Sequence, residues 1–199
     1  MSFYVGAVTI AALICAAFLA AILIWSILFP SHRLWPTGRV TVFTQAMVWT
    51  PTVVIFVAAP IVGIIEWNAL DWFDWLRFGV GVPLIVGGNI IVWRGVFGIG
   101  MDATSGARGQ LKTDGLYRYT RNPQYLADMG ILTGWAVLSA SPSAWIIAAS
   151  GVAALALAPF AEEPWLEEIY GDPYRRYCKS APRFLGVPGY LTENGGESR

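Results

Sequence analysis

The chain has 199 residues, of which 56% are hydrophobic and only 13% are charged, and its formal net charge is zero. Soluble domains usually carry about 25% charged residues, so the composition excludes an ordinary soluble domain, and the neutral net charge gives no case for a nucleic-acid partner. A single histidine, His32, and two distant cysteines, Cys15 and Cys178, argue against a metal site or a disulfide scaffold.

Long apolar runs predict an all-α integral membrane bundle. A transmembrane helix needs about 20 mostly apolar residues, and the sequence predicts about five such helices. They cover residues 3–29, 47–65, 76–99, 125–140 and 144–160. The last two are separated only by Ser141-Pro142-Ser143, which predicts a tight helical hairpin. We expect one membrane domain over 1–199, with N-terminal helices over 1–97, a cofactor region over 98–190 and a flexible tail over 191–199.

The charged residues predict how the chain is oriented in the membrane. With about five spans, residues 30–46, 100–124 and the C-terminal tail share one side, which holds most of the arginine and lysine residues. The opposite side holds Glu66, Asp71 and Asp74, with Arg77 as its base. The positive-inside rule places the basic side in the cytoplasm and the N-terminus outside. We expect a multi-pass protein of the bacterial inner membrane, with the lipid bilayer as its surroundings.

Glu162 and Glu163 directly follow the last apolar run. Ionisable groups at the end of a membrane helix are costly unless they are paired, hydrated or functional. A solvated helix end is the simpler alternative, because Glu167 and Glu168 follow. Both interpretations remain open from these residues alone.

Asp128 is a second unusual charge, one helical turn after Tyr125 and on the same face. It is placed to accept a hydrogen bond from Arg121 or Arg118, or to serve only as a favourable charge near a helix N-terminus. Asn122-Pro123 is a good helix start, with Asn122 as the cap, a role that does not exclude a ligand contact.

Gly98 and Gly100 lie near the end of the third apolar run. Glycines in this position usually allow close helix packing, and no strand precedes them, so they are not a dinucleotide-binding fingerprint. Arg94 lies one turn earlier and either extends to the membrane interface or points inward at an anionic group.

These motifs together resemble the superfamily of integral membrane methyltransferases that contains the isoprenylcysteine carboxyl methyltransferases and the phospholipid methyltransferases. The match covers about half of the chain, from Gly98 onward. It is carried by Gly115-Leu116-Tyr117, Arg121-Asn122-Pro123-Gln124-Tyr125, Glu162-Glu163, Tyr170-Gly171, Tyr174, Tyr177 and Pro182-Arg183-Phe184.

The resemblance implies S-adenosylmethionine as the cofactor. It implies that Gly98 and Gly100 allow close backbone approach, and that Glu162 or Glu163 holds a cofactor hydroxyl or amine. Lys112 or Arg121 suits the carboxylate of the cofactor. For an amine acceptor, Asp128 or a glutamate such as Glu163 would take up the proton. The residues implied to wrap the cofactor are Gln110, Leu111, Lys112, Tyr117, Asn122, Pro123, Gln124 and Tyr125.

Two departures narrow the methyl acceptor. The isoprenylcysteine branch usually has His where this chain has Asn122, and it has an arginine about one turn before the acidic pair, where Ala158 and Pro159 lie here. The resemblance therefore favours a lipid or a membrane-accessible small molecule, with a phospholipid-type amine favoured over a prenylcysteine carboxylate.

Two other functions stay open. Membrane sterol and enone reductases, which bind NADPH, share an R-H-P-x-Y-x-x-D stretch that resembles Arg121 to Asp128. A non-catalytic membrane scaffold would use the same tyrosine, arginine and glutamate residues only for anchoring at the interface.

Overall fold

The protein is seen in a computed structural model whose described residues are 2–37, 41–99 and 110–186. Within these ranges the chain is helical and contains no strand, which confirms the predicted all-α bundle. The long helices are α1 (Ser2–Leu28), α2 (Val42–Ile65), α4 (Val82–Ile99), α6 (Pro123–Ser139) and α7 (Pro142–Tyr170). The short elements are η1 (Pro30–His32), α3 (Asp74–Leu76), the π-helical turn η2 (Arg77–Gly81), η3 (Gly115–Arg118) and α8 (Asp172–Ser180).

Four of the described helical segments are long and apolar enough to cross a membrane: Phe3–Leu28, Val42–Ile65, Asp74–Val96 and Pro142–Tyr170. The chain is therefore a multi-pass membrane protein. The helix α6 has 17 residues and is the short member of the bundle.

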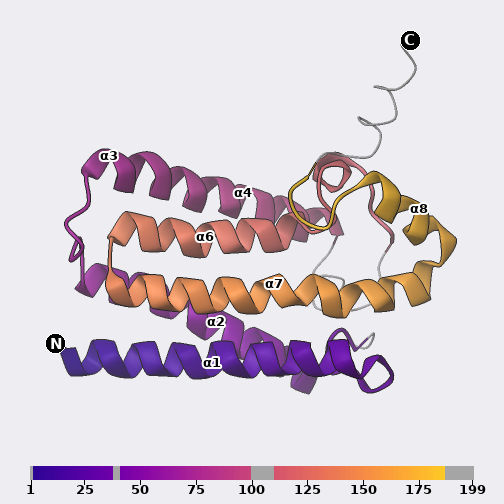
Figure 1. Ribbon diagram of the computed structural model, residues 1–199, viewed down its shortest axis with the longest axis horizontal. Coiled ribbons are helices and arrows are strands. Elements are labelled where there is room, and N and C mark those ends of the chain that lie inside the picture. The colour runs from indigo at the N-terminus through magenta and orange to yellow at the C-terminus, as the bar shows by residue number, and fades with distance from the viewer. Residues whose placement is uncertain (1, 38–40, 100–109, 187–199) are drawn as a thin grey trace, which may run out of the picture.

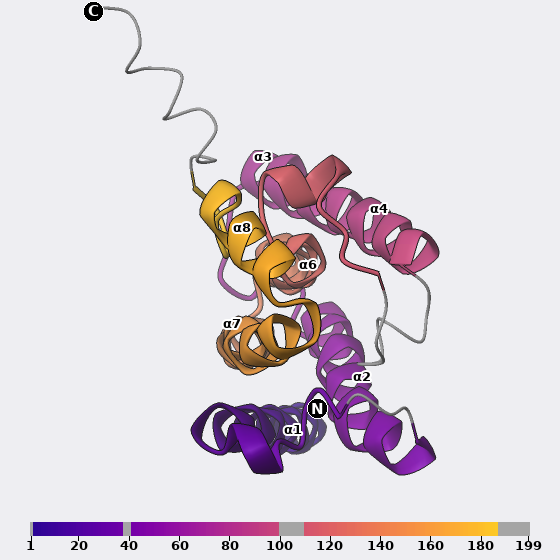
Figure 2. The same cartoon turned by 90° about the vertical axis from the view of Figure 1, so that its right-hand side faces the viewer.

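The helices α1, α7, α6 and α4 lie side by side in that order, and α2 crosses them and packs against α1, α7 and α6 (Figures 1 and 2). The N-terminus, the turn between α6 and α7 and the start of α3 lie at one end of the bundle (Figure 1). The helix α8 and the start of α6 lie at the opposite end. The acidic loop before α3, which contains Glu66 and Asp71, therefore lies at the opposite end of the bundle from the described basic segments around α6 and α8. The predicted topology requires this arrangement.

A line of glycines brings α4 into backbone contact with α6. Gly81, Gly88 and Gly95 are spaced by seven residues, a spacing that returns to nearly the same face of a helix. A Cβ atom at Gly88 would lie 2.6 Å from Ile131 Cγ1, and one at Gly95 would lie 2.5 Å from Gln124 Nε2. Small residues at such contacts are typical of membrane helices, which lack a hydrophobic driving force between them.

The turn between α6 and α7 forms the predicted hairpin. Ala140 ends α6 in the left-handed region at φ 46°, and the Ser141 hydroxyl caps α7 by accepting the Ala144 N–H at 3.0 Å. The Glu66 carboxylate accepts from the Ser141 hydroxyl at 2.6 Å and from the Ser143 N–H at 3.1 Å. Burial alone would raise the pKa of Glu66, but these hydrogen bonds outweigh it and lower the pKa. The end of α2 is thereby fixed to the hairpin.

Two predicted boundaries were wrong. The last long helix does not end at residue 160 but continues through Glu162, Glu163 and Pro164 to Tyr170, a length of 29 residues. The helix α2 begins at Val42 rather than at 47, because Thr41 and Thr44 form a capping box. The predicted flexible tail, 191–199, lies outside the described residues.

Candidate functional site

A cavity of about 270 Å³ lies between α1, α2, α4, α6 and α7, with Trp35 from the loop after α1 in its wall. Most of its lining is apolar, as in most small-molecule sites. The apolar part consists of Leu19, Leu23, Val48, Trp49, Val53, Phe56, Val92, Val96, Leu155 and Ala158. The polar part consists of Trp35, Thr52, Gln124, Tyr125, Asp128 and Glu162.

Glu162 is one of the two carboxylates in the described lining of this cavity, with Asp128. It accepts a hydrogen bond from Trp35 Nε1 at 2.9 Å and another from the Tyr125 hydroxyl. Both bonds reach Oε1, and Oε2 has no hydrogen-bond partner among the described residues. The interpretation of Glu162 as a solvated helix end was wrong, because the residue is half-buried and α7 continues past it.

The loop after α1 holds Trp35 in place. Ser26, near the end of α1, accepts the backbone N–H groups of Leu34 and Trp35 at 3.0 Å each. Its own hydroxyl donates to the Ile22 carbonyl at 2.8 Å. Trp35 is consequently buried and its indole N–H is aimed at Glu162. The sequence analysis missed this residue, since nothing local relates the first polar loop to an acid more than a hundred positions later.

Asp128 and Gln124 lie one turn apart on α6 and both line the cavity. Asp128 has no hydrogen-bond or ion-pair partner among the described residues, so of its two alternatives the bond from Arg121 or Arg118 is not formed. Arg121 is directed at Glu163 instead. The buried Gln124 Nε2 atom also has no partner in the described part of the chain. Two polar side chains of α6 are thus left for a ligand.

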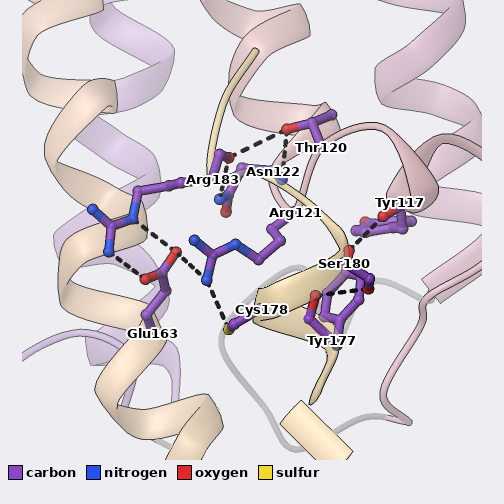
Figure 3. Close-up of polar contacts among 9 residues, drawn as sticks. All are labelled: Tyr117, Thr120, Arg121, Asn122, Glu163, Tyr177, Cys178, Ser180 and Arg183. Atoms are coloured by element: carbon purple, nitrogen blue, oxygen red, sulfur yellow. Dashed lines mark hydrogen bonds and ion pairs between the residues drawn. The ribbon is translucent and has the colours of Figure 1, made fainter. Parts of the chain in front are cut away.

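Glu163 belongs to a different group of contacts, shown in Figure 3. Its carboxylate pairs with Arg121 at 3.2 Å and with Arg183 at 2.8 and 2.5 Å. The Arg183 guanidinium also lies 4.1 Å from the centre of the Phe160 ring. Glu163 does not line the cavity; it fixes the C-terminal segment to the start of α6.

The backbone of the same segment is held by the residues before α6. The Arg183 carbonyl accepts from Thr120 Oγ1 at 3.2 Å and from Asn122 Nδ2 at 2.9 Å (Figure 3). The Arg121 N–H donates to the Pro182 carbonyl at 2.8 Å. Asn122 occupies the N-cap position of α6, but its side chain makes no capping bond and serves this cross-link instead.

Tyr117 contacts α8. Its carbonyl accepts from the Tyr177 hydroxyl at 2.7 Å (Figure 3), and its side chain packs on the core formed by Tyr174, Tyr177 and Ala181. Burial and the negative charge of nearby Glu162 raise the pKa of Tyr117 to about 12. The Tyr117 phenol therefore stays neutral, and it lies close enough to Glu162 to interact with its charge.

The structure thus divides the predicted site residues. Tyr125, Asp128 and Glu162 converge on the cavity, whereas Arg121, Asn122 and Glu163 hold the C-terminal segment. The remaining predicted residues lie elsewhere. Pro123 is buried at the start of α6, and Leu111 packs on the core formed by Tyr174, Tyr177 and Ala181. Lys112 is half-buried, Gln110 and Arg94 are exposed, Gly98 lies in the last turn of α4, and Gly100 is outside the described residues.

Known proteins resemble this chain in two ways. A family model described as phospholipid methyltransferase matches residues 76–173. Steroid 5-alpha-reductase DET2 from Solanum lycopersicum is 26% identical over 116 residues, which cover 58% of this chain and 44% of that protein. The match spans less than half of the length of that relative, and no solved structure matches. The family match contains η2, α4, α6 and Glu162.

Proposed function

We propose that this protein is a membrane methyltransferase that uses S-adenosylmethionine and acts on an amine of a lipid or of a small membrane-accessible molecule. The observation that carries the proposal is the carboxylate of Glu162. It lies within the phospholipid methyltransferase segment, faces the cavity and keeps one oxygen free of partners among the described residues.

The residues around Glu162 fit this cofactor. S-adenosylmethionine supplies a methyl group on a sulfonium cation, and it also carries an ammonium and ribose hydroxyls. The Glu162 carboxylate suits the ammonium or the hydroxyls, and the aromatic rings of Trp35 and Tyr125 suit a cation. The unpartnered Gln124 amide offers a further hydrogen bond. Trp35, Tyr125 and Glu162 come from three separate parts of the chain, and hydrogen bonds hold them in place before a ligand arrives.

We assign the proton transfer to Asp128. An amine must attack with a free lone pair: its nitrogen forms a bond to the methyl carbon while the carbon–sulfur bond breaks and sulfur keeps the electron pair. The product nitrogen is then positively charged and loses one proton. The Asp128 carboxylate faces the cavity and has no described partner that competes for this proton. Holding donor and acceptor in line would supply most of the rate acceleration.

The basic end of the bundle is proposed to face the cytoplasm. The described segments next to α6 and α8 carry the arginines that the positive-inside rule expects on the cytoplasmic side. The N-terminus, at the opposite end in Figure 1, would then lie outside a bacterial inner membrane. This orientation would place the start of α6, with the lining residues Gln124 and Tyr125, on the side from which a cytoplasmic cofactor enters.

A reductase is the second candidate, because the similarity to the steroid 5-alpha-reductase covers more than half of this chain. Direct binding separates the two functions. Purified protein in nanodiscs is titrated with labelled S-adenosylmethionine and with labelled NADPH, and methyl transfer to total membrane lipid is followed with the labelled donor. Saturable binding of the methyl donor and a labelled lipid product are expected; saturable binding of NADPH alone would establish the reductase instead.

Two substitutions sharpen this experiment. Glu162→Gln removes the charge at the cavity and is expected to weaken donor binding about 10- to 100-fold, the loss typical of a hydrogen bond to a charged group. Glu167→Gln is the matched control on the same helix, because Glu167 is exposed and its carboxylate pairs with the surface residue Arg175. Equal donor affinity in the two variants would contradict the assignment of Glu162.

A further inference from the structure

The charges around the cavity are of one sign. Glu162 and Asp128 both line it, and its described lining contains no arginine or lysine. Glu162 receives hydrogen bonds from two neutral groups, the Trp35 indole and the Tyr125 hydroxyl. A ligand in this cavity therefore meets two acids, and no cation of the described walls offsets them.

Three described arginines near the basic end of the bundle already have carboxylate partners. Arg121 and Arg183 pair with Glu163, and Arg33 pairs with Glu168. Withdrawing Arg121 toward a ligand would leave Glu163, with only 13% of its side chain exposed, without that partner. Removing one partner from a buried ion pair is strongly unfavourable. Arg121 and Arg183 are consequently poor ligands for an anion in the cavity.

The remainder of the lining suits a hydrocarbon body. Leu19 of α1, Phe56 of α2 and Leu155 of α7 form apolar walls beyond the two acids. A pocket that is largely apolar with a few convergent polar groups orients an amphiphilic ligand by its polar end. Here the polar end of the acceptor would lie at Asp128, next to Glu162.

We infer that the cavity selects a lipophilic amine that carries neither phosphate nor carboxylate. The assignment of this amine as the methyl acceptor rests on the proposed function. The ammonium group lies at Asp128, beside the methyl donor held by Glu162, and the hydrocarbon body lies against α1, α2 and α7. A zwitterionic phospholipid is selected against, because its phosphate is only a few bonds from its amine. That phosphate would approach the two acids without a described cation beside it, and such like-charge contacts are strongly discriminating.

The first experiment measures methyl transfer to matched acceptors. Protein in nanodiscs receives labelled methyl donor and the same mole fraction of a long-chain primary amine, the alcohol or the carboxylic acid of the same chain length, or phosphatidylethanolamine. The amine is expected to react at least about tenfold faster than phosphatidylethanolamine, a difference that corresponds to about 1.4 kcal/mol. Methylation of phosphatidylethanolamine at an equal or higher rate, or methylation of the acid, would overturn the inference.

The second experiment measures binding without catalysis. The thermal unfolding midpoint is recorded with the amine and with the matched alcohol, for the unmodified protein, for Asp128→Asn and for Asp172→Asn. Asp172 is an exposed acid on α8 that pairs with Arg175, so its variant controls for the loss of one charge. The amine is expected to raise the midpoint more than the alcohol in the unmodified protein and in Asp172→Asn, and this difference should vanish in Asp128→Asn.

This design separates the two proposals. If the protein binds NADPH and not the methyl donor, the proposed function fails, and the thermal comparison still tests the preference for an amine. If the methyl donor binds and the amine and the alcohol stabilise the protein equally, the inference fails and the proposed function stands. Asp128→Ser serves as the second charge variant if Asp128→Asn does not fold, with the same expected loss of the difference between amine and alcohol.

Discussion

Substitution of two adjacent glutamates should separate stability from binding. Glu163→Gln removes the charge that Arg121 and Arg183 share, and the side chains of Glu163 and Arg121 are each 13% exposed. Breaking a buried ion pair costs about 3–5 kcal/mol. The pair with Arg183 contributes little more, because the Arg183 side chain is 34% exposed to solvent. We therefore expect the free energy of unfolding to fall by about 3 kcal/mol. For a chain of this size, that loss lowers the unfolding midpoint by roughly 6–12 °C.

Glu162→Gln should behave in the opposite way. The amide oxygen of a glutamine still accepts from Trp35 and Tyr125, so the stability should change by about 1 kcal/mol or less. Donor binding should fall, because the negative charge at the cavity is lost. The assay is thermal unfolding together with a binding isotherm for labelled S-adenosylmethionine. A Glu163→Gln midpoint within about 2 °C of the unmodified protein, or unchanged donor affinity in Glu162→Gln, would refute this reasoning.

Three further predictions concern the glycine contacts and the hairpin. Gly88→Ala should destabilise the bundle by about 1–3 kcal/mol in thermal unfolding, since its Cβ meets α6 at 2.6 Å, whereas Gly87→Ala, which meets nothing within 4 Å, should not. Gly95→Ala should push Gln124 toward the cavity and weaken ligand binding more than it lowers the midpoint; an unchanged isotherm would contradict this. Glu66→Gln should destabilise the protein by about 1–2 kcal/mol at neutral pH. Because the pKa of Glu66 is lowered in the folded state, its contribution is present above the usual value of 4.5 and is lost as the pH falls through the folded pKa. The difference from the unmodified protein should therefore shrink below about pH 4.5, and a difference that is constant with pH would argue against the hydrogen bonds as its cause.

The sequence predicts those parts of the fold that depend on local patterns. Apolar runs located the long helices, and Ser141 with its neighbours located the hairpin turn, because hydropathy and turn residues act within a few positions. The end of α7 could not be predicted in this way. Glu162, Glu163 and Pro164 have the composition of a helix end, yet the helix continues because partners far along the chain satisfy the two acids.

The candidate site was predictable to a similar extent. Tyr125, Asp128 and Glu162 were expected as site residues, and the structure brings them to one cavity. The sequence does not predict that Glu162 and Glu163 have different partners. Adjacent residues of a helix point about 100° apart, and the packing of neighbouring segments decides which of the two contacts the arginines. Trp35 was missed for the same reason.

The short helix α6 has a consequence for how the protein is assembled in the membrane. Its 17 residues span about 25 Å, less than the roughly 30 Å hydrocarbon core, and it carries Asp128. A carboxylate near the centre of an isolated helix costs about 2.5–3.5 kcal/mol on insertion. In the folded bundle, α4, α7 and α2 surround α6 (Figure 2). We therefore expect α6 to wait at the insertion machinery until α7 has been synthesised, and to enter the bilayer with it as a pair.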